Sequence, residues 1–238
     1  MYPCSVQPFL QSLVSFLDEH PVNTNAFFRA FEAEYLTPDQ LRVFLRHYHY
    51  FCKHFVKLLE GLLFNTPLEQ VEMRIELVKT LHSELGNGHL DQAHITLLNR
   101  FAQALGLTPS DLDATTPLPE IQRYMQLLHR LFIESDYLVA LGAETAVEVT
   151  AASEFKYLYP GLRKYSYFQD NDLIFFKLHL QEELSHGQWL LEAVEKTAQS
   201  PEDRAKVLAA ARETADAWHA FWRGLYREVF GRPADAAA

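Results

Sequence analysis

Apolar residues recur at three- and four-residue spacing along most of the chain, which is the pattern of amphipathic helices. In the stretch that follows Thr37, one face of such a helix carries Leu41, Phe44, Leu45, Tyr48, Phe51 and Cys52. Thr37 fits an N-cap and Pro38 fits the first helical position. We therefore expect a helix from about Pro38 to near Leu63.

The same signals predict helices in the rest of the chain. Thr108 and Ser200 each precede a proline and an acidic first turn, so helices should begin there. The remaining segments with helical spacing of apolar residues are 68–85, 91–105, 118–148, 172–196 and 201–230. The alternation typical of strands is not evident, and no flexible or Pro-rich linker divides the chain. We predict an all-α bundle of about seven helices, forming one domain over residues 1–230, with a frayed tail at 231–238.

Composition and charge narrow the class of protein. The chain has 238 residues, 48% of them hydrophobic, which is enough for a buried core and excludes a disordered protein. Its 31 acidic and 21 basic residues leave a formal charge of -10, so nucleic acid is not an expected partner. No stretch is apolar enough to span a membrane, and no export signal is evident. Cys4 and Cys52 are too few for a disulfide framework, and we expect a cytoplasmic protein.

Candidate metal ligands lie on the predicted helix 172–196. His179, Glu183 and His186 are spaced i, i+4 and i+7, which places them within about 40° of one another around a helix. Imidazole and carboxylate ligands suit iron, manganese or zinc, and the absence of thiolates argues against a structural zinc site. A solvated surface stripe of the same residues is the alternative.

A second candidate group surrounds a predicted turn. The sequence Gly-Asn-Gly at 86–88 should stop one helix just after Glu84, and His94 should lie in the first turn of the next helix. Such a turn could return both side chains to one site. Taken alone, this spacing is also compatible with ordinary surface residues.

A third candidate group is a pair of carboxylates one helical turn apart, Glu144 and Glu148. Small residues surround them, including Ala140 and Gly142, and would allow a neighbouring helix to approach closely. A carboxylate on such a tightly packed helix is a candidate to bridge two metals. Either residue could instead be an ordinary surface acid, and Glu148 is the preferred ligand.

Taken in order, these motifs resemble those of the haem-oxygenase-like diiron oxidases. The residues that match the family's ligands are Glu84, His94, Glu148, His179, Glu183 and His186. The resemblance implies a haem-oxygenase-like fold, two iron ions (with manganese as an alternative metal) and O2 as a co-substrate. It also implies that Glu84, His94 and His186 surround one metal, that His179 and Glu183 surround the other, and that Glu148 bridges them.

The chain departs from the family pattern at a few positions. Glu183 stands where the family more often has Asp, and His89 stands where an acidic residue is expected. Some members draw a further carboxylate from an earlier helix. Glu60 is the nearest candidate for that role, and it is left outside the ligand set.

The resemblance implies an O2-dependent oxidase or oxygenase that acts on a small molecule, such as an amino acid or fatty acid derivative, or on its own side chain. Aromatic residues that could line its pocket are Tyr48, Tyr50, Phe51, Tyr137, Phe175 and Phe176. Two alternatives stay open: a metal-free enzyme of the same fold, similar to TenA or PqqC, and a non-catalytic interaction protein. A thiaminase-like enzyme would need a thiol from the middle of the chain, and no Cys follows Cys52. We expect a small-molecule substrate, with a homodimer left open.

Overall fold

The computed structural model describes residues 8–234, except for the side chains of residues 181–188. Its α-helices are α1 (Pro8–Asp18), α2 (Ala26–Ala33), α3 (Pro38–Asn65), α4 (Val71–Glu84), α5 (His94–Ala104), α6 (Pro109–Asp113), α7 (Pro119–His129), α8 (Tyr137–Arg163), α9 (Ile174–Thr197) and α10 (Pro201–Phe230). The described residues contain no strand, so the all-α prediction is confirmed. The ten α-helices in the described part of the chain are more than the seven or so expected, partly because the sequences of short helices such as α1 and α2 showed no clear periodicity signal.

The capping residues chosen from the sequence do cap helices. The side chains of Thr37, Thr108 and Ser200 each accept a hydrogen bond from the backbone N–H three residues later, at the starts of α3, α6 and α10. In all three caps the side chain of the residue at that third position accepts a hydrogen bond from the backbone N–H of the cap residue. These reciprocal bonds satisfy two backbone donors that a helix start leaves unpaired.

The segment 118–148, expected as one helix, contains parts of two. Helix α7 continues into a π-helical turn, η4 (Arg130–Glu134), and Ser135 then adopts an extended conformation. Asp136 starts α8 by accepting a hydrogen bond from the backbone N–H of Val139. Because Asp is a good N-cap, it begins a new helix at this position. Helix α8 also continues to Arg163, well beyond the expected end at Glu148.

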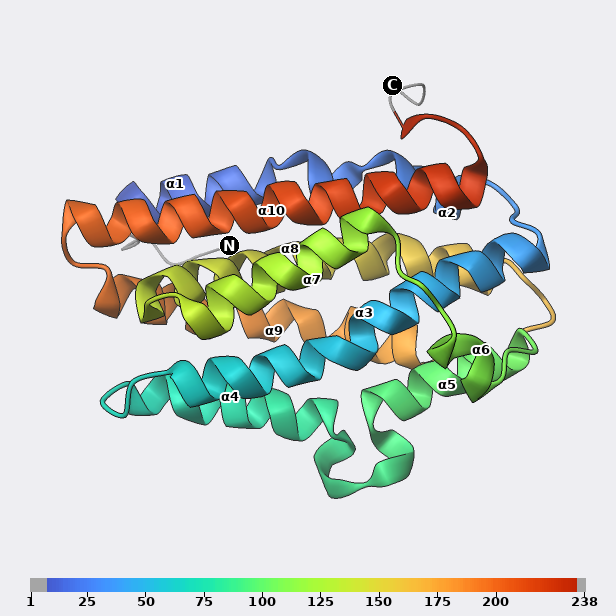
Figure 1. Ribbon diagram of the computed structural model, residues 1–238, viewed down its shortest axis with the longest axis horizontal. Coiled ribbons are helices and arrows are strands. Elements are labelled where there is room, and N and C mark those ends of the chain that lie inside the picture. The colour runs from blue at the N-terminus through green and yellow to red at the C-terminus, as the bar shows by residue number, and fades with distance from the viewer. Residues whose placement is uncertain (1–7, 235–238) are drawn as a thin grey trace.

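Helix α8 packs against both α9 and α10, and in Figure 1 it lies behind α7. Helix α10 runs along one edge with α1 and α2, while α4 and α5 form the opposite edge. At Gly142 of α8, a Cβ atom would lie 2.3 Å from the carbonyl oxygen of Val207 on α10. The expectation that small residues allow close packing of this helix is therefore confirmed.

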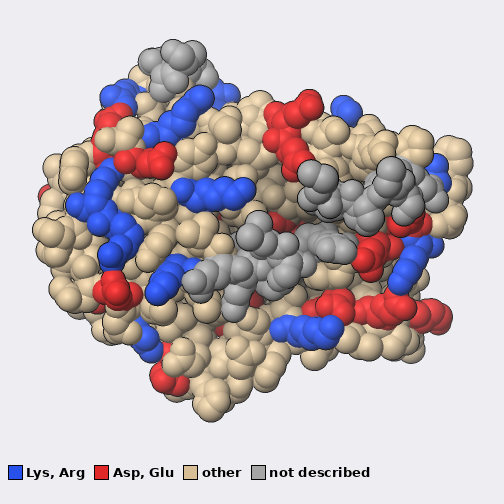
Figure 2. All heavy atoms as spheres, turned by 180° about the vertical axis from the view of Figure 1, so that it is seen from behind, with Lys and Arg blue, Asp and Glu red and all other residues tan. Residues whose placement is uncertain are grey.

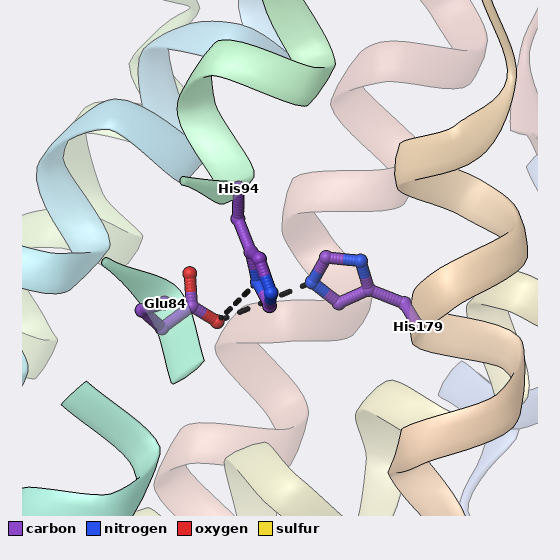
Figure 3. Close-up of side chains that lie close together, drawn as sticks. All are labelled: Glu84, His94 and His179. Atoms are coloured by element: carbon purple, nitrogen blue, oxygen red, sulfur yellow. Dashed lines mark ion pairs between the residues drawn. The ribbon is translucent and has the colours of Figure 1, made fainter. Parts of the chain in front are cut away.

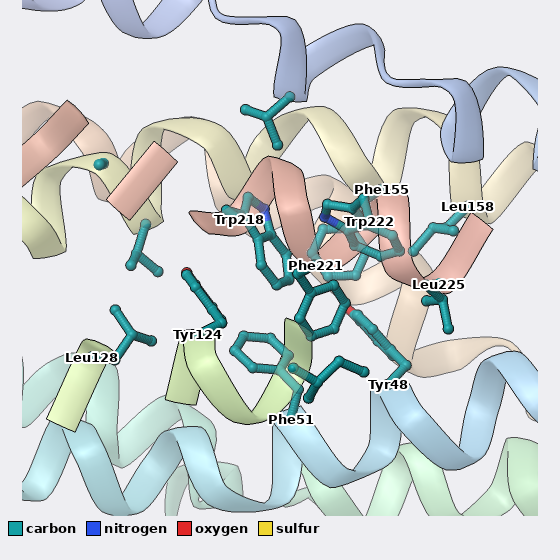
Figure 4. Packing of buried hydrophobic residues seen from close by; sticks show 14 of the residues in the cluster. Tyr48, Phe51, Tyr124, Leu128, Phe155, Leu158, Trp218, Phe221, Trp222 and Leu225 are labelled. Carbon is teal, nitrogen blue, oxygen red and sulfur yellow. The ribbon is translucent and has the colours of Figure 1, made fainter. Parts of the chain in front are cut away.

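A cluster of aromatic side chains fills the space between α3, α7, α8 and α10 (Figure 4). The ring of Trp218 lies 4.4 Å from that of Phe221, 4.8 Å from that of Tyr124 and 5.0 Å from that of Phe51, measured between centroids. Such rings bury large apolar areas and pack in tilted or edge-on geometries. They form a rigid wall beside the candidate site.

The surface carries both signs of charge, and basic and acidic side chains are spread over the face shown in Figure 2. Among the described residues, no helix combines the length and apolar character needed to cross a bilayer. Gly231 ends α10 in a left-handed conformation, with φ of 65°. Residues 235–238 of the predicted tail lie outside the described residues.

Candidate metal centre

A sharp turn brings Glu84 and His94 together. Helix α4 ends at Glu84 and α5 begins at His94, as the sequence predicts. Between them, Gly86, Asn87 and Gly88 all have positive φ, and a Cβ atom on Gly86 would lie 2.3 Å from the backbone nitrogen of Ala93. The turn places Nδ1 of His94 3.1 Å from Oε1 of Glu84. The expectation that this turn returns both side chains to one place is confirmed.

Helix α9 adds His179 to this pair (Figure 3). Its Nε2 lies 4.0 Å from Oε1 of Glu84, and its ring centroid lies 4.5 Å from that of His94. One ligand atom from each of the three residues lies within 4.8 Å of the other two. We call Glu84, His94 and His179 the three-ligand cluster.

His179 is held in the orientation and tautomer that a metal ligand needs. Its Nδ1 lies 2.8 Å from the carbonyl oxygen of Phe175, a bond that requires the proton on Nδ1. The lone pair is then on Nε2, which lies on the side of Glu84. The rings of Phe155 and Phe175 pack on the imidazole, with centroids at 4.6 and 4.2 Å. These contacts restrict rotation of the ring.

His94 offers a direct test of whether the cluster fits a cation. The residue is only 5% exposed, and its Nδ1 is buried without a hydrogen bond to any described residue, despite its closeness to Glu84. An unsatisfied buried nitrogen is costly and calls for an explanation. A metal ion bound by this nitrogen and the Glu84 carboxylate would remove that cost. Two imidazoles and a carboxylate suit iron or manganese.

Glu144 and Glu148 are both buried, so the alternative that they are surface acids is wrong. Glu148 lines the same cavity as the three-ligand cluster. Glu144 does not line it, is fully buried, and has neither carboxylate oxygen hydrogen-bonded within the described part of the chain. Burial, followed by the nearby charge of Glu148, raises the pKa of Glu144 well above its ordinary value. Burial thus disfavours the charged form of the Glu144 carboxyl.

The structure bears to different extents on the remaining predicted ligands, Glu183 and His186, on the division of ligands between two metals, and on Glu60. The expected helix through residues 183 and 186 is confirmed, but the side chains of Glu183 and His186 lie outside the described residues. The expected grouping placed Glu84 and His179 on different metals, whereas the structure brings them into one cluster. Glu60 is exposed and paired with Lys57 at 3.1 Å, and it does not line the cavity.

The three-ligand cluster lies on the wall of a cavity of about 80 Å³. The aromatic residues that line it are Tyr48, Phe51, Phe55, Tyr124, Phe155, Phe175 and Trp218. Of the aromatic residues that the sequence suggested, Tyr48, Phe51 and Phe175 line this cavity, while Tyr50, Tyr137 and Phe176 do not. Aromatic walls of this kind keep water away from a reactive centre.

The cavity contains one carboxyl group that sequence reasoning missed, Glu154. Its Oε1 accepts a hydrogen bond of 2.5 Å from the hydroxyl of Tyr48, and its burial raises its pKa to about 8. Glu154 lies on the face of α8 that also carries Val147 and Ala151, at the i, i+4 and i+7 spacing of a helix. That spacing would have found it, had the predicted helix not ended at Glu148.

Cys52 also lines the cavity. Burial, and then the charges of Glu154 and Glu84, raise the pKa of its thiol well above the ordinary value. Because the thiolate is the nucleophile, this environment does not suit covalent catalysis. The geometry thus gives no support to a thiaminase-like role for this cysteine.

Known proteins resemble this chain over nearly its whole length. A 4-aminobenzoate synthase from Nitrosomonas europaea is 28% identical over 226 residues, covering 92% of this chain and 91% of its own. A 4-aminobenzoate synthase from Chlamydia trachomatis is 24% identical over 214 residues, covering 90% of each chain. The similarity is spread across both proteins and is not confined to one segment.

Solved structures share the fold. A CADD-like protein of unknown function from Nostoc punctiforme has a TM-score of 0.77 at 21% identity, covering 93% of this chain and 96% of its own. A TenA homologue from Pseudomonas syringae has a TM-score of 0.78 at 17% identity, covering 95% and 96%. A domain with a haem-oxygenase-like fold from Shewanella denitrificans has a TM-score of 0.68 at 16% identity, covering 92% of this chain and 90% of its own, so the expected haem-oxygenase-like fold is confirmed. Residues 42–219 match the family described as iron-containing redox enzyme, a span that holds the three-ligand cluster, and the chain belongs to that family.

Proposed function

We propose that this protein is a non-haem diiron oxidase or oxygenase that uses O2 to oxidise a small molecule. The observation that carries the proposal is the three-ligand cluster on the wall of a buried cavity. Membership of an iron-containing redox family supports it. Mixed imidazole and carboxylate ligands that leave coordination positions open are the type of set that allows iron to react with O2.

The residues would divide between two metals as follows. Glu84, His94 and His179 would hold one iron, and Glu148, on the same cavity wall, would bridge to the other. Glu183 and His186, one and two turns beyond His179 in the sequence, are the proposed ligands of the second iron. When bound, the irons would supply the O2-dependent redox chemistry.

The protein's own side chains prepare the site for that chemistry. The carbonyl oxygen of Phe175 fixes the proton of His179 on Nδ1, and the packed rings of Phe155 and Phe175 orient the imidazole. The aromatic walls limit access of water to the cavity. With a pKa of about 8, Glu154 holds a proton at neutral pH beside the hydroxyl of Tyr48.

The first specific reaction to test is formation of 4-aminobenzoate. Two relatives that each cover about nine tenths of this chain carry the name 4-aminobenzoate synthase. The aromatic ring of this product would come either from an added small molecule or from a tyrosine of the protein itself. Tyr48 and Tyr124 both line the cavity and are the candidates for the second source.

The test is anaerobic loading with iron, elemental analysis, exposure to O2, and mass spectrometry of both small-molecule products and the intact protein. We expect close to two irons per chain and consumption of O2. His94→Ala should lose most of the iron and the O2 consumption, because it removes a cluster ligand. His89→Ala is the matched control, since His89 is exposed on the same connecting segment.

Two outcomes would contradict the proposal. One is a wild-type chain that takes up neither iron, manganese nor zinc, which would favour a metal-free TenA- or PqqC-like enzyme or an interaction protein. The other is a His94→Ala variant with unchanged iron content and unchanged O2 consumption.

A further inference from the structure

Glu154 gives the cavity a polar group that the three-ligand cluster does not use. Its side chain is 2% exposed and lines the cavity. One carboxylate oxygen accepts the hydrogen bond from Tyr48, but the other, Oε2, has no hydrogen-bond partner among the described residues. A buried acceptor without a partner is costly and indicates a missing donor.

The charges around the cavity indicate what kind of donor fits. Its described lining includes three acids but no Lys or Arg. Two of these acids, Glu84 and Glu148, are assigned to the metals, and Glu154 is the third. The sequence of residues 181–188, whose side chains are not described, contains no Lys or Arg either. Neither the described lining nor segment 181–188 therefore offers a Lys or Arg side chain to pair with Glu154.

The size and walls of the cavity limit the rest of the ligand. A cavity of about 80 Å³ has about half the volume of the roughly 150 Å³ cavity that accommodates benzene, so it accepts only a few non-hydrogen atoms. Phe51, Tyr124 and Trp218 present aromatic surface, which binds alkyl groups and attracts cations. A short alkyl amine, or the amine end of a longer molecule, meets these conditions.

We propose that Glu154 binds the amino group of the substrate, and that the substrate class is a small primary amine. This inference rests on the proposed function, because it takes the cavity to be where the substrate binds. Beside an ammonium group Glu154 would give up the proton that it holds without a ligand, because a nearby positive charge favours the carboxylate. The ammonium group would then donate to Oε2 and pair with that carboxylate. A charge-assisted hydrogen bond of this kind is about twice as strong as a neutral one. An alcohol of the same shape can donate a hydrogen bond but supplies no compensating charge.

The experiment compares n-propylamine with 1-propanol by isothermal titration calorimetry on the anaerobic iron-loaded protein. We expect the wild-type chain to bind the amine at least about tenfold more tightly. Glu154→Gln keeps the size of the side chain but removes its charge, so it should abolish this preference. Glu144→Gln is the matched control, because it neutralises another buried carboxyl of α8 that does not line the cavity.

Equal binding of amine and alcohol by the wild-type chain would overturn the inference, and so would wild-type amine affinity in Glu154→Gln. If Glu154→Gln does not fold, Glu154→Asp replaces it. That variant keeps a carboxyl but shortens the side chain by one methylene, so it should weaken amine binding, and wild-type amine affinity there would overturn the assignment to Glu154. Selective amine binding without iron uptake or O2 consumption would defeat the proposed function alone. Iron uptake and O2 consumption, together with equal binding of n-propylamine and 1-propanol, would defeat this inference alone.

Discussion

Two carboxyls on α8, one helical turn apart, have different surroundings. Glu148 lines the cavity of the three-ligand cluster, whereas Glu144 is enclosed within the bundle. Burial and the charge of Glu148 raise the pKa of Glu144 well above its ordinary value, and Glu144 does not line the cavity of the cluster. The preference for Glu148 at this position therefore has a physical basis.

The expected consequence is a difference in metal content between two conservative variants. Glu148→Gln should lose more than half of the bound iron, because a bridging carboxylate serves both metals. Glu144→Gln should keep its iron, since Glu144 does not line the cavity that holds the cluster. Elemental analysis after anaerobic loading measures both. Equal iron loss in the two variants would contradict the assignment of Glu148 as the bridge.

Glu154 should make the stability of the metal-free protein depend on pH. Its pKa is about 8 in the folded chain against an ordinary value of 4.5. Between these values the folded state holds a proton that the unfolded state releases, so the free energy of unfolding should fall as pH rises from 4.5 to 8. The stabilising contribution is complete below pH 4.5 and is lost as pH passes 8. Its size is on the order of a few kcal/mol.

The measurement is urea unfolding at pH 5.5 and pH 8, followed by circular dichroism. Glu154→Gln carries no titrating group at this position, so its free energy of unfolding should decline less over this interval than that of the wild-type chain. Comparing the two proteins removes the contribution of the other titrating groups. Identical pH dependence in both would show that Glu154 titrates normally.

At the scale of secondary structure, the turn between α4 and α5 determines whether the cluster forms. Gly86 has φ of 75°, and its missing Cβ leaves room for the backbone of Ala93. Gly88 has φ of 85°, but no atom lies within 4 Å of where its Cβ would be. Substitution by Ala strains the backbone at both positions, yet only Gly86→Ala also forces the chain before His94 to move.

We therefore expect Gly86→Ala to lose most of the bound iron, because His94 would move away from Glu84. Gly88→Ala should keep it and should be destabilised by about 1–2 kcal/mol, the cost of a left-handed conformation for a residue with a side chain. Iron analysis and urea unfolding distinguish the two effects. A Gly86→Ala protein with full iron content would show that the turn tolerates rearrangement.

Local signals predicted this turn and several helix starts, but they did not predict the extent of α8. Gly86 and the capping residue Thr37 act on their immediate neighbours, so the sequence is sufficient to identify them. In α8 every residue from Ala140 to Glu148 is buried, and a helix buried on all sides lacks the polar face that periodicity detects. Pro160 lies inside the same helix, although proline usually ends one. Packing against α9 and α10 stabilises α8, and with it the position of Glu154.

At the scale of the whole molecule, the candidate metal ligands connect helices that are distant in sequence. Glu84 ends α4, His94 begins α5, Glu148 lies on α8 and His179 lies on α9. The periodicity of the sequence predicted the helices, and the order of the motifs predicted that these residues belong together. The distances between them depend on how the helices pack, which local patterns do not encode.

Because metal ions at this junction would bind the folded chain and not the unfolded one, iron should raise the melting temperature of the whole bundle. At a free iron concentration 100-fold above the dissociation constant, binding adds about 2.7 kcal/mol to the free energy of unfolding. For a chain of this length that corresponds to an increase of roughly 5–10 °C. Anaerobic thermal unfolding with and without Fe(II), followed by circular dichroism, measures it. His94→Ala should lose most of the increase, and His82→Ala, which replaces an exposed histidine near the end of α4, should keep it. The same increase in His94→Ala would mean that iron stabilises the protein from a site other than the three-ligand cluster.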